Sequence, residues 1–152
     1  MKKILIIAHA PSANTQALAD TANRAANHHD FDVEVVCKSP QHTQADDVLT
    51  ADAVILGTTE NLGYMAGLTK DFFDRCYYQC LDKKQGMAYA IYIRAGFDGE
   101  GTKRALKTIN NGLKWQLVQQ PLVLKGAWRD DFIEQVAELA MTVAAGVDAG
   151  IF

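Results

Sequence analysis

With 152 residues, of which 49% are hydrophobic and 22% charged, the chain has the size and composition of one globular domain, residues 1–152. Its net charge of −3 argues against a nucleic-acid-binding surface, which is normally basic. No apolar run is long enough to cross a membrane, and the short one near the N-terminus is not typical of a signal peptide. The three cysteines form no CxxC or zinc-type pattern, which favours a reducing cytoplasm.

The first part of the chain predicts two strands around one helix. Lys3–Ala8 is a continuous, branched apolar run, as in a strand that a parallel sheet buries on both faces. Thr15–Asn27 follows as an alanine-rich helix whose small-residue face can approach a sheet closely. Phe31–Cys37 alternates apolar and acidic residues, which indicates a second strand nearer the sheet edge, and Ser39-Pro40 ends it.

The middle of the chain predicts a third strand and a second long helix. Residues 41–51 are polar and form a connection or a short helix. Ala53–Gly57 is continuous and apolar and predicts a strand that stops at its glycine. After a loop, Leu68–Leu81 has helical spacing, and its apolar side carries Cys76 and Cys80 one turn apart, as expected of buried thiols.

The rest of the chain predicts two further strands and two helices. Met87–Ile93 is the fourth strand, and it runs into residues 94–101, the most glycine-dense stretch of the chain. The remaining predicted elements are a helix with Thr102 as its N-cap that reaches about Val118, a short fifth strand at Leu122–Leu124, and a last helix from Asp130 or Asp131 to near residues 146–150.

Five strands that alternate with helices predict a parallel sheet covered by helices on both faces. In such sheets, ligands bind beyond the carboxyl ends of the strands. The unusual residues of this chain fall there, since the glycine- and hydroxyl-rich loops 9–15, 58–67 and 94–101 follow the first, third and fourth predicted strands. We therefore expect the three loops to lie along one rim of the sheet.

The first loop is suited to a phosphate held by neutral donors. A helix start leaves backbone N–H groups without partners and carries partial positive charge, and no Lys or Arg lies between Ile4 and Arg24. The other two loops contribute glycines, through which backbone amides can approach a flat ligand, and the aromatic residues Tyr64 and Phe97. A planar heterocycle with a phosphate tail fits this set, and flavin mononucleotide (FMN) is such a ligand.

Two segments carry a resemblance to a known family. Ser12-Ala13-Asn14-Thr15, after a buried strand, resembles the flavodoxin-type phosphate loop T/S-x-T-G-N-T. Residues 57–75, from Gly57-Thr58-Thr59-Glu60-Asn61 to Phe72-Phe73-Asp74-Arg75, are similar to the second flavin loop and following helix of flavodoxins, quinone reductases and NAD(P)H-dependent FMN reductases. The resemblance spans nearly the whole chain. It implies a flavodoxin-like three-layer sandwich with a five-stranded parallel sheet in the order 2-1-3-4-5.

The resemblance also implies the residues of the cofactor site. It places Ser12, Ala13, Asn14 and Thr15 around the FMN phosphate, Thr58, Thr59, Glu60, Asn61, Leu62, Gly63 and Tyr64 along one side of the isoalloxazine ring, and Arg94, Ala95, Gly96, Phe97 and Gly99 along the other. Ala10 stands where the family has a hydroxyl, and Ala13 where it has glycine. A left-handed backbone at Ala13 would cost roughly 1 kcal/mol, which predicts weakened FMN binding.

By the same resemblance, the expected function is an oxidoreductase that passes electrons from NAD(P)H through FMN to a quinone, a flavin or another small acceptor. A flavodoxin-type electron carrier to protein partners is one alternative, and a flavodoxin-fold interaction module without flavin is another. Carriers are usually strongly acidic around the flavin edge, whereas Glu60, Asp98 and Glu100 are offset here by cations, which favours the enzyme. Small reductases of this kind are often dimers or tetramers, which leaves a homo-oligomer open.

Several other kinds of site are not expected. A phosphorylation receiver domain needs paired acids after the first strand, and this chain has His9-Ala10 there; a low-molecular-weight phosphatase needs Cys-x5-Arg, and no cysteine precedes Cys37. The flavin carries the chemistry, so we predict no catalytic side chain. We also predict no metal site, because the His28-His29 pair ends a helix, where imidazole suits the dipole.

Overall fold

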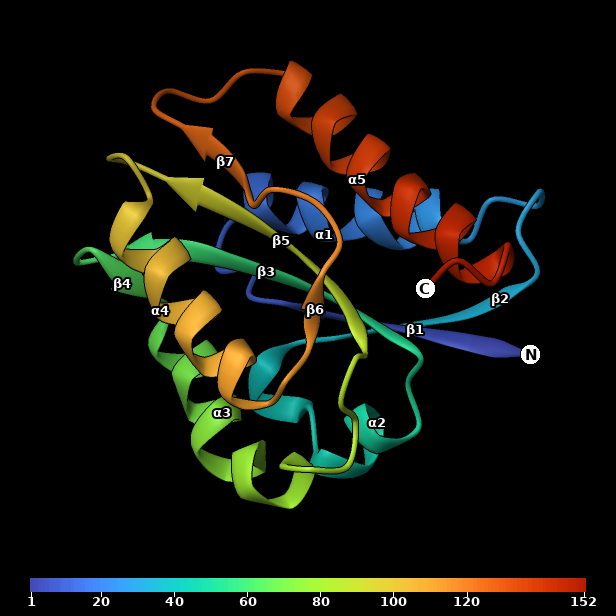
Figure 1. The fold of residues 1–152 in the computed structure, drawn as a ribbon. Coiled ribbons are helices and arrows are strands. Elements are labelled where there is room, and N and C mark those ends of the chain that lie inside the picture. The colour runs from blue at the N-terminus through green and yellow to red at the C-terminus, as the bar shows by residue number, and fades with distance from the viewer.

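The computed structural model describes residues 1–152 and is organised around a parallel β-sheet (Figure 1). Strands β2, β1, β3 and β5 lie in that order, and both β6 and β7 pair with the outer side of β5, all in parallel. The predicted order 2-1-3-4-5 is confirmed, with β5 and β7 as the fourth and fifth strands. The strand bounds are β1 Lys2–Ala8, β2 Val33–Lys38, β3 Ala53–Asn61, β4 Tyr64–Met65, β5 Ala88–Ala95, β6 Gln116–Leu117 and β7 Leu122–Lys125.

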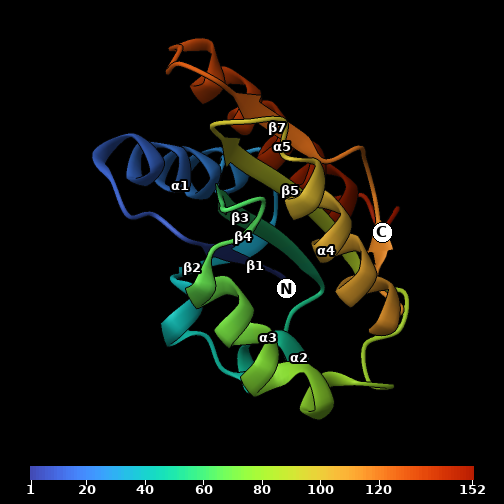
Figure 2. The same cartoon turned by 90° about the vertical axis from the view of Figure 1, so that its left-hand side faces the viewer.

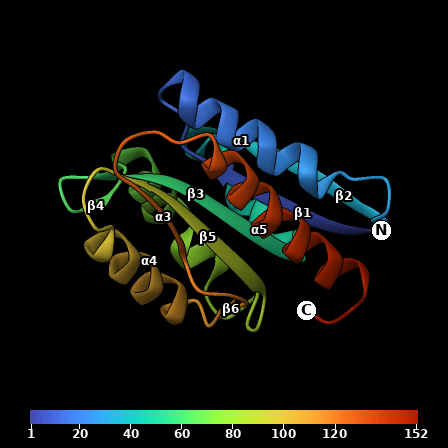
Figure 3. The same cartoon turned by 90° about the horizontal axis from the view of Figure 1, so that it is seen from above.

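Helices cover both faces of the sheet, as predicted. Figure 3 shows α1 and α5 side by side on one face, with α3 and α4 on the other. No helix combines the length and the apolar character that crossing a membrane requires. The helical bounds are α1 Ala13–Ala26, the 3₁₀ helix η1 Pro40–His42, α2 Ala45–Leu49, α3 Gly67–Cys80, α4 Glu100–Gly112 and α5 Asp131–Asp148.

The continuous apolar runs form strands that are buried on both faces. Successive side chains of a strand point to opposite faces, so Ile4 and Ile6 of β1 pack under α1 and α5, while Leu5 and Ile7 pack under α2 and α3. On the first face, α1 contributes Leu18 and a series of alanines, whose small size lets the helix lie close to the sheet.

Helix α4 begins and ends earlier than predicted, and its N-cap is not Thr102. The N-cap is Gly99, with a left-handed backbone at φ 69°, and the buried Thr102 hydroxyl instead donates a hydrogen bond of 2.8 Å to the carbonyl of Tyr64. The helix ends at Gly112 because the chain then turns back to pair Gln116 with β5. Thr102 therefore holds a tertiary contact rather than a helix end.

The last edge of the sheet is split into β6 and β7. Leu117 pairs with Tyr89, and Leu122 pairs with Tyr92. Four residues, 118–121, therefore lie between the two pairs on the edge strand, whereas only two, 90–91, lie between them on β5. The extra residues leave the ladder, and the segment includes Pro121, which has no N–H to donate. Together with the β3–β4 hairpin, this split explains why the sheet has seven strands rather than the predicted five.

Gly57, at the centre of the sheet, makes room for the side chain of Tyr92. The two residues are register partners on β3 and β5, and a Cβ atom on Gly57 would lie 2.2 Å from Cζ of Tyr92. The Tyr92 ring thus lies across the glycine, with its hydroxyl buried and without a hydrogen-bond partner. This burial raises the pKa of Tyr92. The pair fixes the spacing of β3 and β5 just before both strands reach the rim.

Replacing Gly57 with alanine is expected to destabilise the fold by about 1–3 kcal/mol, because the methyl group would overlap a buried ring that cannot move without disturbing the core. Urea denaturation measures the change. Gly67→Ala is the matched control, since no atom lies within 4 Å of the position of the added methyl group and the residue opens α3, so its free energy of unfolding should be unchanged or slightly raised. Equal losses in the two variants would contradict the packing role of Gly57.

Candidate functional site

The three loops predicted to share a rim do so. Figure 2 looks onto this edge of the molecule, where the start of α1, the β3–β4 hairpin and the end of β5 face the viewer. The backbone joins two of them directly, since the N–H of His9 donates to the carbonyl of Gly57 at 2.9 Å. The carboxyl ends of β1, β3 and β5 thus form one candidate site.

The start of α1 leaves two backbone amides free. Ser12 is the N-cap and forms a capping box with Thr15, in which each side-chain oxygen accepts from the other residue's N–H, at 3.2 Å and 2.9 Å. The amides of Ala13 and Asn14, which precede any possible intrahelical acceptor, have no hydrogen bond. No acidic residue lies in this first turn, and residues 11–14 are exposed. The helix start can therefore receive an anion.

The strain expected at Ala13 is absent. Ala13 is the first residue of α1 and does not have a positive φ. The prediction that the alanine would weaken the loop through its backbone conformation is wrong, because the helix begins earlier than the Thr15 start that the sequence pattern suggested. Both departures from the family pattern remain, but only the one at Ala10 removes a polar group, since a hydroxyl is missing there.

The second loop is a hairpin, not an irregular segment. Strand β3 continues to Asn61 and pairs with Tyr64 through a two-residue turn, in which Leu62 and Gly63 have φ of 53° and 75°. Two positive values define the type I′ turn that suits a two-residue hairpin. Leu62 adopts this conformation despite its Cβ, at a cost of roughly 1 kcal/mol, and its side chain is fully exposed at 106%. An apolar side chain is thus held at the tip of the rim.

Thr58 anchors the hairpin from below. Its side chain is 2% exposed, and its hydroxyl oxygen accepts from the N–H of Ala66 at 3.1 Å and lies 3.4 Å from the hydroxyl of Thr69 in α3. The Thr59 hydroxyl donates to the side-chain oxygen of Asn61 at 2.8 Å. Of these two predicted site residues, Thr58 holds the loop in place and Thr59 lies nearer the surface.

Glu60 joins the second loop to the third. Its two carboxylate oxygens accept hydrogen bonds from the backbone N–H groups of Phe97 and Gly99, both at 2.7 Å. These short, charge-assisted bonds span the two loops and fix the backbone of residues 97–99. Glu60 is therefore a positioning residue of the rim, a role that its sequence neighbourhood does not indicate.

The start of α4 presses against the hairpin at a second point. A Cβ atom on Gly101 would lie 2.0 Å from the carbonyl oxygen of Gly63, so only glycine allows this approach. The Thr102–Tyr64 hydrogen bond lies beside it. Neither Gly101 nor Thr102 was predicted as a site residue: the glycine density of residues 94–101 was the only signal for Gly101, and Thr102 was predicted as a helix N-cap.

The third loop presents Phe97 outward and turns Arg94 inward. Phe97 is 72% exposed, and the neighbouring Gly96 is exposed as well, whereas Ala95 and Gly99 are buried. The Arg94 guanidinium donates to the carbonyls of Ala95 and Leu124, and its Cζ lies 5.0 Å from the ring centroid of Phe132. In this arrangement Arg94 packs against the start of α5 rather than extending over the rim.

A cavity of about 480 Å³ lies on the side of the first loop that faces β2. It is formed by the ends of β1 and β2, α1 and the start of α3, and the sequence did not reveal it because its walls come from four separate segments. Burial lowers the pKa of His9, and burial together with Asp20 raises the pKa of the Cys37 thiol. Neither group is charged at neutral pH, so this cavity has neutral walls apart from Lys38, which pairs with Asp47 at 2.8 Å.

The other two thiols lie in the core. Cys76 and Cys80 lie on the buried side of α3, as predicted, and burial raises the pKa of Cys80 to about 11. A thiol that stays protonated at neutral pH is a poor nucleophile. No cysteine of the chain is in a disulfide.

Comparison with known structures identifies the fold. No protein-family model and no curated sequence matches the chain. An archaeal flavodoxin superposes with a TM-score of 0.80 at 20% identity, covering 97% of this chain and 99% of that one. Rubredoxin oxygen:oxidoreductase from Desulfovibrio gigas superposes with a TM-score of 0.78 at 16% identity, covering 99% of this chain and 37% of that one. A WrbA-like flavodoxin from Agrobacterium tumefaciens superposes with a TM-score of 0.72 at 13% identity, covering 95% of this chain and 96% of that one. The chain has the flavodoxin-like fold.

Glu60→Ala is expected to lower the free energy of unfolding by about 1–3 kcal/mol and to speed hydrogen exchange at the amides of Phe97 and Gly99, since both lose their acceptor. Amide exchange followed by NMR reads both sites. Glu100→Ala is the control: its carboxylate is exposed and pairs only with Lys103, so the loss should stay below about 1 kcal/mol. Unchanged exchange at residues 97 and 99 in Glu60→Ala would refute the bridge.

Proposed function

We propose that this chain, which has the flavodoxin-like fold, binds FMN at the rim and passes electrons from NAD(P)H through it to a quinone, a flavin or another small acceptor. The observation that carries the proposal is the meeting of three complementary parts at one edge: an uncharged helix start with free amides, an exposed hairpin, and a glycine-rich loop with an exposed aromatic residue. The three free thiols suit a reducing cytoplasm.

The phosphate end of the site fits FMN. A phosphate at the start of α1 would receive hydrogen bonds from the free amides of Ala13 and Asn14, and the exposed side chains of Ser12 and Asn14 would lie beside it. Thr15 is buried, and its hydroxyl is engaged by Ser12, so its contribution is to hold the loop. The helix dipole would supply the favourable field in place of a cation.

The ring end of the site fits a flat ligand between two loops. On one side the hairpin offers the exposed residues Asn61, Leu62, Gly63 and Tyr64, with Thr59 and Glu60 half-buried beneath them. On the other side Gly96 and Phe97 are exposed, while Ala95 and Gly99 shape the backbone below. Thr58 and the Arg94 side chain would act indirectly, through the hydrogen bonds that set the positions of the hairpin and of β7.

When bound, FMN supplies the hydride and electron transfer chemistry. The chain's own residues would bind and orient it, and Glu60 would keep the third loop in the position that faces the ring. Charges around the rim are mixed and largely paired within the chain: Glu100 with Lys103, and Glu60 with two backbone amides. Such a rim lacks the strongly acidic surface that steers a carrier to basic partners, which favours a small acceptor.

An electron carrier to protein partners is the second candidate. It is supported by the likeness to flavodoxins over nearly the full length of both chains. The fully exposed Leu62 at the hairpin tip would then lie where a partner could contact it. The two candidates share the FMN site and differ in whether the protein reacts with NAD(P)H.

The phosphate assignment is tested by Ser12→Asp against Ser12→Asn. Both side chains are good N-caps and differ only in charge, so both variants should keep the stability of the parent. The carboxylate would repel the phosphate by about 1–4 kcal/mol, and FMN affinity should fall at least about fivefold in Ser12→Asp alone. Titration by flavin fluorescence measures it. Riboflavin, which has no phosphate, should bind both variants alike; equal FMN affinity in the two would refute the assignment.

The reaction is tested by NADH and NADPH oxidation with FMN-loaded protein and a quinone. An oxidoreductase should exceed the rate of free FMN at the same concentration, and the excess should fall in Ser12→Asp with its FMN occupancy. A protein that binds FMN but gives only the free-FMN rate is the carrier. A protein without FMN affinity would exclude both candidates.

A further inference from the structure

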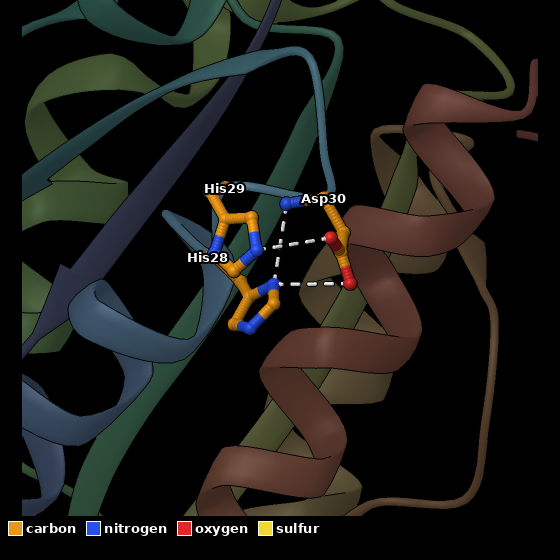
Figure 4. Close-up of side chains that lie close together, drawn as sticks. All are labelled: His28, His29 and Asp30. Atoms are coloured by element: carbon orange, nitrogen blue, oxygen red, sulfur yellow. Dashed lines mark hydrogen bonds and ion pairs between the residues drawn. The ribbon is translucent and has the colours of Figure 1, made fainter.

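His28, His29 and Asp30 form a cluster in the turn between α1 and β2 (Figure 4). The turn precedes Val33, which pairs with Lys2 at the start of β1, so the cluster lies at the amino ends of the strands, across the sheet from the rim. From the sequence we predicted no metal site here, because a histidine at a helix end has a sufficient explanation in the dipole. The structure adds the positions of the side-chain atoms.

Both imidazole rings turn toward the same carboxylate. Nδ1 of His28 lies 3.4 Å from Oδ2 of Asp30, and Nε2 of His29 lies 3.3 Å from Oδ1. The centroids of the two rings lie 4.2 Å apart with the ring planes tilted by 30°, and the ligand atoms of all three residues lie within 4.8 Å of one another. Figure 4 shows both nitrogens directed at the carboxylate of Asp30 rather than into solvent.

The arrangement places lone pairs opposite one another. Nδ1 of His28 accepts a hydrogen bond of 3.2 Å from the backbone N–H of Asp30, so in that pairing this nitrogen carries a lone pair and no proton. The same nitrogen faces a carboxylate oxygen, which is also an acceptor. Two acceptors at this distance repel unless a hydrogen atom or a metal ion lies between them, and either the other ring tautomer, with its N–H on Nδ1, or a bound ion would supply it.

The nitrogen–oxygen distances of the cluster are close to those around a bound transition metal. Zn²⁺ bonds of about 2.0–2.1 Å to His nitrogen and carboxylate oxygen, at tetrahedral angles, set neighbouring ligand atoms about 3.3–3.4 Å apart. The two nitrogen–oxygen separations of the cluster are close to this value, although they lead to different oxygens of the Asp30 carboxylate, and the three ligand atoms lie within 4.8 Å of one another. A bound ion would draw the ligand atoms closer together. Imidazole and carboxylate together suit Zn²⁺, Co²⁺, Ni²⁺ and Cu²⁺ better than Mg²⁺ or Ca²⁺. The exposure of His29 and Asp30 leaves room for water as the fourth ligand.

The turn is held in place by contacts outside the cluster. The N–H of Phe31 donates to the carbonyl of His28 at 3.0 Å, and the rings of these two residues lie 6.0 Å apart. The N–H of Asp32 donates to Oδ1 of Asp148 at the end of α5, at 3.1 Å. An ion bound here would therefore join a turn that is already tied to the last helix.

We propose that His28, His29 and Asp30 bind one divalent transition-metal ion of the Zn²⁺ class. His28 supplies Nδ1, His29 supplies Nε2, and Asp30 supplies a carboxylate oxygen. The ion replaces the Asp30 N–H as the partner of Nδ1 and removes the repulsion between facing acceptors. This site is independent of the rim and of FMN.

Isothermal titration of the chain with ZnCl₂ at pH 7.5 tests the proposal, in a Cys37→Ser background because this free thiol is a competing ligand. One Zn²⁺ per chain should bind. Loss of an outer-shell partner weakens metal binding by about 10–100-fold, so the loss of a direct ligand in His29→Ala or Asp30→Asn should weaken it at least about tenfold. His42→Ala, whose ring contacts Ser39, is the control and should not change it.

The visible spectrum of bound Co²⁺ gives a second measurement, which would not change if the three residues only stabilised the turn. The bound ion should show visible bands typical of low-symmetry nitrogen and oxygen ligation, and these bands should disappear in His29→Ala while the far-UV circular dichroism stays unchanged. No Zn²⁺ binding, or equal affinity in the parent, His29→Ala and Asp30→Asn, would overturn the proposal and leave hydrogen bonds between the rings and the Asp30 carboxylate as the interaction that holds the cluster.

Discussion

The parallel pairing of β3 with β1 on one side and β5 on the other is the constraint on which the candidate site depends. Ala8 pairs with Gly57, and Gly57 pairs with Tyr92, so these three residues lie in one row across the sheet. Each of the three loops leaves the sheet at or just beyond this row. Because the Tyr92 ring fills the space above Gly57, the row has little freedom to shift. The packing of Tyr92 on Gly57 in the core is therefore the reason that the three loops start side by side.

The order of elements could be predicted from the sequence because buried parallel strands have a strong pattern. The runs at Lys3–Ala8, Ala53–Gly57 and Met87–Ile93 are apolar without alternation, and helices of 3.6-residue periodicity separate them. The hairpin could not be predicted in the same way. Residues 58–61 are polar and Leu62-Gly63 is a poor match to the Asn-Gly turns that mark type I′ hairpins, so the end of β3 appeared to be a loop.

The chemistry of individual side chains was harder to predict than their location. Ser12 is both a helix cap and a candidate phosphate contact, and a local pattern cannot separate the two, since the capping box and the free amides of Ala13 and Asn14 coexist in one turn. Thr102 and Glu60 each find a partner 37 to 39 residues away. Local propensity and residue spacing do not predict such partners, because the two residues come together only after the sheet has formed.

The Glu60 bridge bears directly on how strongly a neutral site can hold a charged ligand. If FMN binds at the rim as proposed, amides and a helix dipole would hold its phosphate without a lysine or arginine, and each of these is worth only a fraction of an ion pair. Much of the affinity would then come from contacts with the ring. Ordering a flexible glycine-rich loop around a ring would cost about 1–2 kcal/mol for each residue fixed. In this chain the third loop is already ordered when the protein folds, before any ligand binds, because Glu60 holds the backbone of residues 97–99 and Gly101 lies against Gly63. A flat ligand would then meet two loops whose separation the protein itself has set, and the loss of one hydroxyl at Ala10 would matter less than any change that frees the third loop.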